Sequence, residues 1–200
     1  MSTGELKIAM TIEESDFFKE CLSGVRRYYE YGIGGSTLFA WNLLNKSGLN
    51  FKVFGIDTSS EWVEKVKAAI NDDMHVELEF LNIGPTENWG HPVDKTPNLE
   101  LWPLYPMGIY RILKYRELDL VLIDGRFRVA CLIQTVLACQ TFTKILIHDY
   151  ENRPFYHVIE KWVSKKKSVG TLALFEKKEL TKNDVLEMQK AFLTYWRVLD

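Results

Sequence analysis

Short apolar runs alternate along this chain with longer stretches in which apolar side chains recur at helical spacing. The short runs predict strands at 25–31, 51–56, 76–81, 118–124, 144–149 and 169–176. The longer stretches predict helices at 36–46, 58–70, 106–116, 129–139, 154–163 and 184–198. Strands that alternate with helices are typical of a parallel sheet covered on both faces. We therefore expect a doubly wound, mostly parallel, Rossmann-like α/β fold with about six or seven strands and helices on both faces.

Two segments depart from this alternation. Residues 1–24 are expected to form a helical lead-in, because the Thr11 hydroxyl can cap a helix while the Glu14 side chain reaches back to it. Residues 82–104 are expected to form a long loop insertion, because glycines and prolines interrupt any regular pattern there. The aromatic side chains of Trp89, Trp102 and the nearby Tyr105 either form a lid that stacks on a sugar or aromatic ring, or anchor the loop. The whole of 1–200 is expected to be a single domain.

Composition and charge limit the partners. The formal net charge is -2, so no overall positive field attracts nucleic acid or an anionic membrane. The N-terminus is acidic and lacks the basic start of a signal peptide, and no apolar run is long enough to span a membrane. We therefore expect a cytoplasmic protein. The short run Lys165–Lys167 is interpreted as a solvated turn.

Polar residues gather where the predicted strands end. The strand at 25–31 runs into Gly32-Ile33-Gly34-Gly35, a turn that lets a ligand approach the backbone, and the helix that opens at Ser36 presents free amides. Asp57 ends the second strand, close to the offset at which an acid bonds a ribose hydroxyl. The carboxyl ends of parallel strands share one edge of a sheet, so these groups predict a site for a nucleoside-bearing ligand.

These residues resemble the class I S-adenosylmethionine-dependent methyltransferases over about residues 25 to 150. The segment Glu30-Tyr31-Gly32-Ile33-Gly34-Gly35-Ser36 is similar to the acid and glycine turn that open the cofactor site of that family. The resemblance implies S-adenosylmethionine as cofactor, with its methionine portion surrounded by the turn and its ribose bound by Asp57. It also implies that Asn82 and Ile83 flank the adenine and that Asp124 lines the cofactor site.

Two further strand ends resemble those of small O-methyltransferases, in which acids can hold a divalent metal. They are Leu122-Ile123-Asp124-Gly125 and Leu146-Ile147-His148-Asp149-Tyr150. Arg126 follows Asp124, and Tyr150 stands where a metal-binding asparagine is often found, so the interpretation without a metal is favoured here. A histidine titrates near neutrality, so His148, like Asp124, is a candidate general base; the alternative is a buried, hydrogen-bonded histidine.

Arginines follow both of these strand ends. Arg126, Arg128 and Arg153 either clamp a carboxylate or phosphate of a substrate, or pair with neighbouring acids and fasten loops. The candidate catalytic residues are accordingly Asp124, His148, Asp149, Arg126 and Arg153.

The favoured function is an S-adenosylmethionine-dependent methyltransferase that O-methylates a small or sugar-like acceptor, acidic acceptors included. One alternative is a non-catalytic, nucleoside-binding relative of these enzymes. Another is an NAD-dependent oxidoreductase, which is disfavoured because Thr37 occupies the place of the third glycine in the dinucleotide fingerprint. The last helix either packs on the sheet or forms a homodimer contact.

Overall fold

The computed structural model describes residues 6–93, 99–115 and 117–198, and they build one seven-stranded sheet. Its strands are β1 (Arg27–Tyr31), β2 (Lys52–Asp57), β3 (Val76–Phe80), β4 (Leu120–Ile123), β5 (Lys144–Ile147), β6 (Val163–Val169) and β7 (Leu172–Lys177). They lie in the order β3-β2-β1-β4-β5-β7-β6. Strands β1 to β5 are parallel, whereas β7 runs antiparallel to both β5 and β6. The expected mostly parallel sheet is therefore confirmed.

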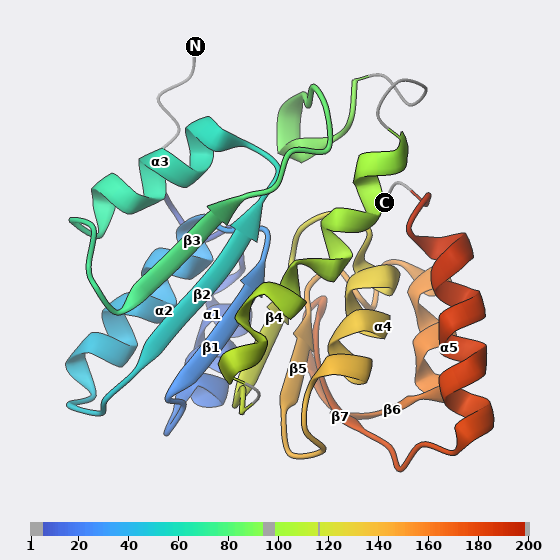
Figure 1. Ribbon diagram of the computed structural model, residues 1–200. Coiled ribbons are helices and arrows are strands. Elements are labelled where there is room, and N and C mark those ends of the chain that lie inside the picture. Colours follow the sequence, from blue (N-terminus) through green and yellow to red (C-terminus); the bar gives the residue numbers. More distant parts are fainter. Residues whose placement is uncertain (1–5, 94–98, 116, 199–200) are drawn as a thin grey trace.

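Helices cover both faces of this sheet, as predicted (Figure 1). One face carries α1 (Ile12–Leu22), α2 (Gly35–Lys46) and α3 (Ser60–Ala69), and the other carries α4 (Arg128–Ala138) and α5 (Lys182–Tyr195). Strand β4 shows how the two faces share one core. Its Leu120 and Leu122 pack toward α1 and α2, while Val121 and Ile123 pack toward α4, because successive side chains of a strand point to opposite faces.

The predicted lead-in contains α1, and its cap has the expected form. The Glu14 amide donates to the Thr11 hydroxyl at 3.2 Å, and the Thr11 amide donates to the Glu14 carboxylate at 2.8 Å. This reciprocal pair satisfies two backbone donors that the first helical turn leaves unpaired. Residues 1–5 of the predicted lead-in lie outside the described residues. None of the helices in the described ranges is long and apolar enough to cross a membrane.

The interpretation of Lys165–Lys167 as a turn is wrong, because these lysines lie within β6. This strand is at the edge of the sheet, and most of its side chains are exposed, so the apolar pattern that reveals a buried strand is missing. Lysines are common on edge strands because they discourage pairing with other chains. The predicted strand at 169–176 is the second half of a hairpin, β7.

Two of the predicted helices are wound more tightly than α-helices. Segments η3 (Pro106–Tyr115) and η4 (Pro154–Lys161) are 3-10 helices, where α-helices were predicted at 106–116 and 154–163. The predicted loop at 82–104 contains two more, η1 (Asn88–Gly90) and η2 (Leu99–Leu104), and residues 94–98 lie outside the described ranges. Trp102 and Tyr105 are buried to 1% exposure in the core, which favours their anchoring interpretation over a lid.

Candidate functional site

The ends of β1, β2, β4 and β5 lie level with one another. Tyr31 pairs with Ile56 on one side and with Ile123 on the other, and Ile123 pairs with Ile147. The next residue of each strand therefore emerges at the same edge of the sheet. This register brings together the glycine turn after β1, Asp57 of β2, Asp124 after β4 and His148 after β5.

The glycine turn fits against the end of β4 because two glycines face each other. Gly32 has a φ of +84°, a conformation that side chains with a β-carbon rarely adopt. A β-carbon on Gly32 would also lie 2.5 Å from the α-carbon of Gly125. The Gly32 amide donates to the carbonyl of Ile56 at 3.0 Å, which extends the sheet by one step. Only glycine satisfies both the backbone angle and this close approach.

Glu30 holds the turn from beneath rather than facing a ligand. Its side chain is fully buried, and its two oxygens accept hydrogen bonds from the hydroxyls of Ser36 and Thr37, the latter at 2.8 Å. The Thr37 hydroxyl also accepts from the Gly34 amide at 2.8 Å. Burial raises the pKa of Glu30 to about 8, against the lowering effect of the hydroxyl hydrogen bonds. Glu30 therefore shapes the glycine turn through these hydroxyls.

Two segments cover the outer side of the turn. The backbone of Lys7 lies against the α-carbon of Gly35, and the Trp62 ring of α3 lies over Gly34. The Trp62 indole also donates to the carbonyl of Ile33 at 2.5 Å. None of these contacts was predicted, because Lys7 and Trp62 are distant from the turn in the sequence.

Asp57 lies beside the turn with its carboxylate largely buried. It accepts the Ser59 amide at 2.9 Å, and the backbone amides of Thr58 and Ile33 also stabilise its charge. Burial dominates over these amides and over the nearby Arg126 guanidinium, so the pKa of Asp57 rises to about 6. A carboxylate has about four acceptor positions. Three amides therefore leave capacity for a hydroxyl group of a bound nucleoside.

The residues after β3 make contacts within the chain, and their expected place beside an adenine stays a prediction. Ile83 is fully buried in the core, and the Asn82 side chain accepts the amide of Gly84 at 2.9 Å. The segment that follows crosses toward β4, where Nε2 of His91 lies 2.8 Å from a guanidinium nitrogen of Arg126. This contact places His91 beside the end of β4, and the adjacent Gly90 lies against the hydroxyl of Thr58, the residue after Asp57.

Asp124, His148 and Asp149 form one cluster at the ends of β4 and β5. Their ligand atoms all lie within 4.8 Å of one another. His148 Nδ1 lies 3.0 Å from the Asp124 carboxylate, and the Arg128 guanidinium lies 3.3 Å from Asp124 and 3.1 Å from Asp149. Arg153 also pairs with Asp149, at 3.2 Å. Arg128 and Arg153 are therefore bound to acids of the same chain.

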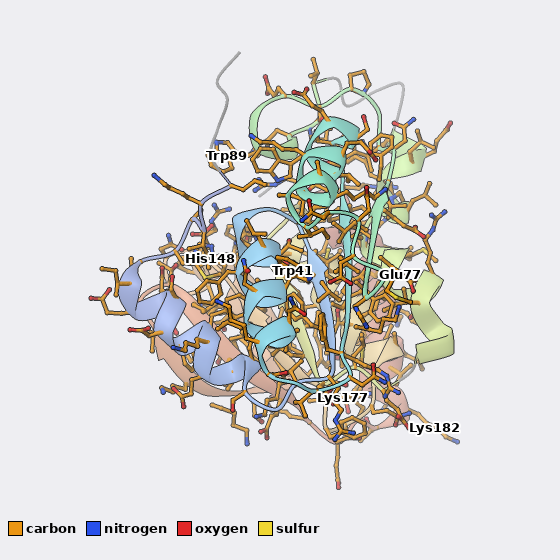
Figure 2. The ribbon with its side chains drawn as sticks, turned by 90° about the vertical axis from the view of Figure 1, so that its left-hand side faces the viewer. Trp41, Glu77, Trp89, His148, Lys177 and Lys182 are labelled. Atoms are coloured by element: carbon orange, nitrogen blue, oxygen red, sulfur yellow. The ribbon has the colours of Figure 1, made fainter. Side chains whose placement is uncertain are left out.

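Both ring nitrogens of His148 face carboxylates. Its Nε2 lies 3.7 Å from the Glu14 carboxylate of α1, and Figure 2 shows His148 beside the start of that helix. Burial disfavours the charged imidazole, but the hydrogen bond and charge of Asp124, together with Asp149, outweigh it, so the pKa of His148 lies above its ordinary value. Because both ring nitrogens already lie against carboxylates of the chain, His148 is a weaker candidate for a general base than Asp124.

Solved structures share this fold. A methyltransferase-like protein from Silicibacter pomeroyi aligns with a TM-score of 0.79 at 26% sequence identity, over 93% of this chain and 96% of that one. The chain is similar to this methyltransferase-like protein in fold and in sequence. An O-methyltransferase from Bacillus cereus, solved in complex with SAH, shares the fold of this chain at a TM-score of 0.57 and 16% identity. That alignment covers 88% of this chain and 84% of the other. No protein-family model and no curated protein matches the sequence.

A cavity of about 510 Å³ lies elsewhere on the molecule, between the end of α4 and the segment after β7. Lys177 lines it, and Figure 2 shows Lys177 and Lys182 at the opposite end of the molecule from Trp89. Trp89 lies in the segment that crosses toward Arg126, and its side chain is 81% exposed. The cavity is therefore remote from the strand ends that hold the candidate residues.

Proposed function

We propose that this chain is an S-adenosylmethionine-dependent methyltransferase. The observation that supports this most strongly is the level alignment of the glycine turn, Asp57 and Asp124 at one sheet edge. Asp57 offers an acceptor for a ribose hydroxyl, and the turn offers a backbone that a ligand can approach closely. The SAH complex of the Bacillus cereus relative agrees with this proposal.

Thr37 provides a specific argument against a nicotinamide cofactor. In the dinucleotide fingerprint this position is a glycine, which permits close packing of the helix. Here the Thr37 side chain is fully buried and bridges Glu30 to the Gly34 amide. The bridge fixes a turn that is built on a threonine rather than on a third glycine.

S-adenosylmethionine supplies a methyl group on a positively charged sulfur. Asp124 would accept the proton of an acceptor hydroxyl while the hydroxyl oxygen takes the methyl group and the sulfonium leaves as a neutral thioether, so O-methylation of a small molecule is the favoured reaction. The Asp124 side chain is 17% exposed and can reach a ligand at the sheet edge. His148 and Arg128 hold this carboxylate in place. Arg153, 30% exposed and beside Tyr156, is the arginine best placed to meet an acidic acceptor.

Calorimetric titration with S-adenosylmethionine and S-adenosylhomocysteine tests the cofactor. We expect both to bind, NAD not to bind, and Asp57→Ala to weaken binding by about 10- to 100-fold, as loss of a hydrogen bond to a charged group would. Asp16→Ala, which removes an exposed acid on α1, is the matched control and leaves binding unchanged. Absence of binding by the wild type, or a preference for NAD, would overturn the proposal.

Transfer of a labelled methyl group to a panel of small hydroxyl compounds tests the reaction. Once an acceptor is found, Asp124→Asn should lower kcat by about 100-fold or more while changing KM little, because a general base acts mainly in the transition state. An Asp124→Asn protein with wild-type kcat would exclude Asp124 as the base.

A further inference from the structure

The cluster of Asp124, His148 and Asp149 has the composition of a divalent metal site. Two carboxylates and an imidazole from neighbouring strand ends suit ions such as Mn²⁺. The class of small O-methyltransferases that these strand ends resemble can hold such an ion there. The contacts of Arg128 decide whether this chain fits one.

The Arg128 guanidinium contacts both carboxylates of the cluster. One terminal nitrogen lies 3.3 Å from Oδ1 of Asp124, and the other lies 3.1 Å from Oδ2 of Asp149 and donates to the carbonyl of His148. Its Nε donates to the carbonyl of Gly125 at 3.0 Å. These contacts tie the ends of β4 and β5 together.

Arg128 stands where a cation is locally unfavourable. It is the first residue of α4, and the positive end of the helix dipole repels cations at that position. The preceding residue, Phe127, has a φ of +55° and is buried against Trp102, with ring centroids 5.5 Å apart. This packing fixes the helix start and directs the Arg128 side chain, which is only 3% exposed, toward the two acids. The negative charges of Asp124 and Asp149 offset the repulsion between the Arg128 guanidinium and the helix dipole.

We infer that the guanidinium of Arg128 takes the place of a divalent cation between Asp124 and Asp149, so that this chain holds its strand-end acids without a metal. One oxygen of each carboxylate, Oδ1 of Asp124 and Oδ2 of Asp149, already pairs with Arg128. An added divalent ion would lie beside a buried guanidinium, and like charges repel strongly where water is scarce. Arg128 is accordingly a positioning residue that orients Asp124.

Mn²⁺ titration followed by electron paramagnetic resonance tests this inference without a methyl donor, so its result is separate from that of the cofactor titration. We expect the wild type to show no saturable site for one Mn²⁺. Arg128→Ala should bind one equivalent of Mn²⁺ at least about tenfold more tightly than the wild type does. Changes at residues that contact the ligands of a metal site alter affinity by a factor of this size. The double variant Arg128→Ala/Asp149→Asn should lose that binding again, and Arg128→Lys, which keeps the cation, should not gain it.

Arg128→Gln is the second neutral variant, because it retains more of the buried packing if Arg128→Ala does not fold. Recovery of circular dichroism by either neutral variant on addition of Mn²⁺ would also support the inference. The inference is overturned if the wild type binds one Mn²⁺ that Asp124→Asn abolishes, or if a folded neutral variant binds Mn²⁺ no better than the wild type. If neither neutral variant folds, the titration of the wild type alone tests the inference. Absence of a saturable Mn²⁺ site supports it, and a site that Asp124→Asn abolishes overturns it.

Discussion

The carbonyl of Lys7 lies directly against the α-carbon of Gly35, the first residue of α2. A β-carbon at Gly35 would occupy the space of that carbonyl, so the N-terminal segment and the glycine turn are packed backbone to backbone. Leu6 and Trp62 join the same small apolar cluster around Ile33. The lead-in is therefore part of the turn's support.

Gly35→Ala should displace the Lys7 segment from the turn. Overpacking of a tight contact costs about 1 to 3 kcal/mol, and we expect a loss of unfolding free energy in this range by urea denaturation. Gly34→Ala is the neighbouring control, because its nearest contact would be the Trp62 ring at 3.1 Å, a side chain that can shift. A Gly35→Ala protein as stable as Gly34→Ala would contradict the contact.

Glu30 makes stability depend on pH. Its pKa is about 8 in the folded protein and near 4.5 when the chain is unfolded, so the folded state retains a proton that the unfolded state releases between these values. The stability of the wild type relative to Glu30→Gln should therefore fall as the pH rises from 4.5 toward 8, and then level off. For a chain of this size, each 1 kcal/mol lowers Tm by roughly 2–4 °C. A Tm difference that stays constant with pH would show that Glu30 does not titrate in this way.

Asp57 should make cofactor binding depend on pH. Its pKa of about 6 means that the carboxylate, which we propose accepts a ribose hydroxyl, is lost in mild acid. We expect S-adenosylhomocysteine affinity to fall by up to about tenfold for each pH unit below 6, because one proton must be released on binding. Calorimetry of the wild type and Asp57→Asn at several pH values measures this. The asparagine variant should bind weakly at every pH, without that slope.

Trp102 and Trp89 lie in the same long segment but should respond differently to truncation. Trp102→Ala empties a fully buried site in the main core and should cost about 3 to 5 kcal/mol. Trp89 is 81% exposed, so Trp89→Ala should change stability by less than about 0.5 kcal/mol. Equal midpoints for the two variants in urea would show that Trp102 does not anchor this segment.

The strands and their acids could be predicted where the signal is local. Asp57 and Asp124 each follow an apolar run, and a run of this kind identifies a buried strand whatever surrounds it. The exposed edge strand β6 has no such apolar run. Three consecutive lysines that face water occupy its middle, so apolar and polar residues do not alternate along it. Its pairing depends on β7, which lies beside it in space.

The pairings within the site depended on tertiary structure. The sequence named Arg128 and Asp149 but left open whether the arginine meets a substrate or an acid, because their approach is set by the packing of α4 against β5. Glu14 was recognised only as part of a helix cap. Its position beside His148 follows from the docking of α1, which no local pattern encodes.

Glu14 also has a consequence for how the chain acquires its structure during synthesis. Its carboxylate accepts both the amide and the hydroxyl of Thr171, at 2.6 and 2.9 Å, across a separation of 157 residues. Helix α1 therefore cannot complete its docking until the β6–β7 hairpin has left the ribosome. A nascent chain that lacks the hairpin would leave the Phe17 ring of α1, which the Lys167 ammonium of β6 covers at 4.6 Å, open to solvent and to chaperones.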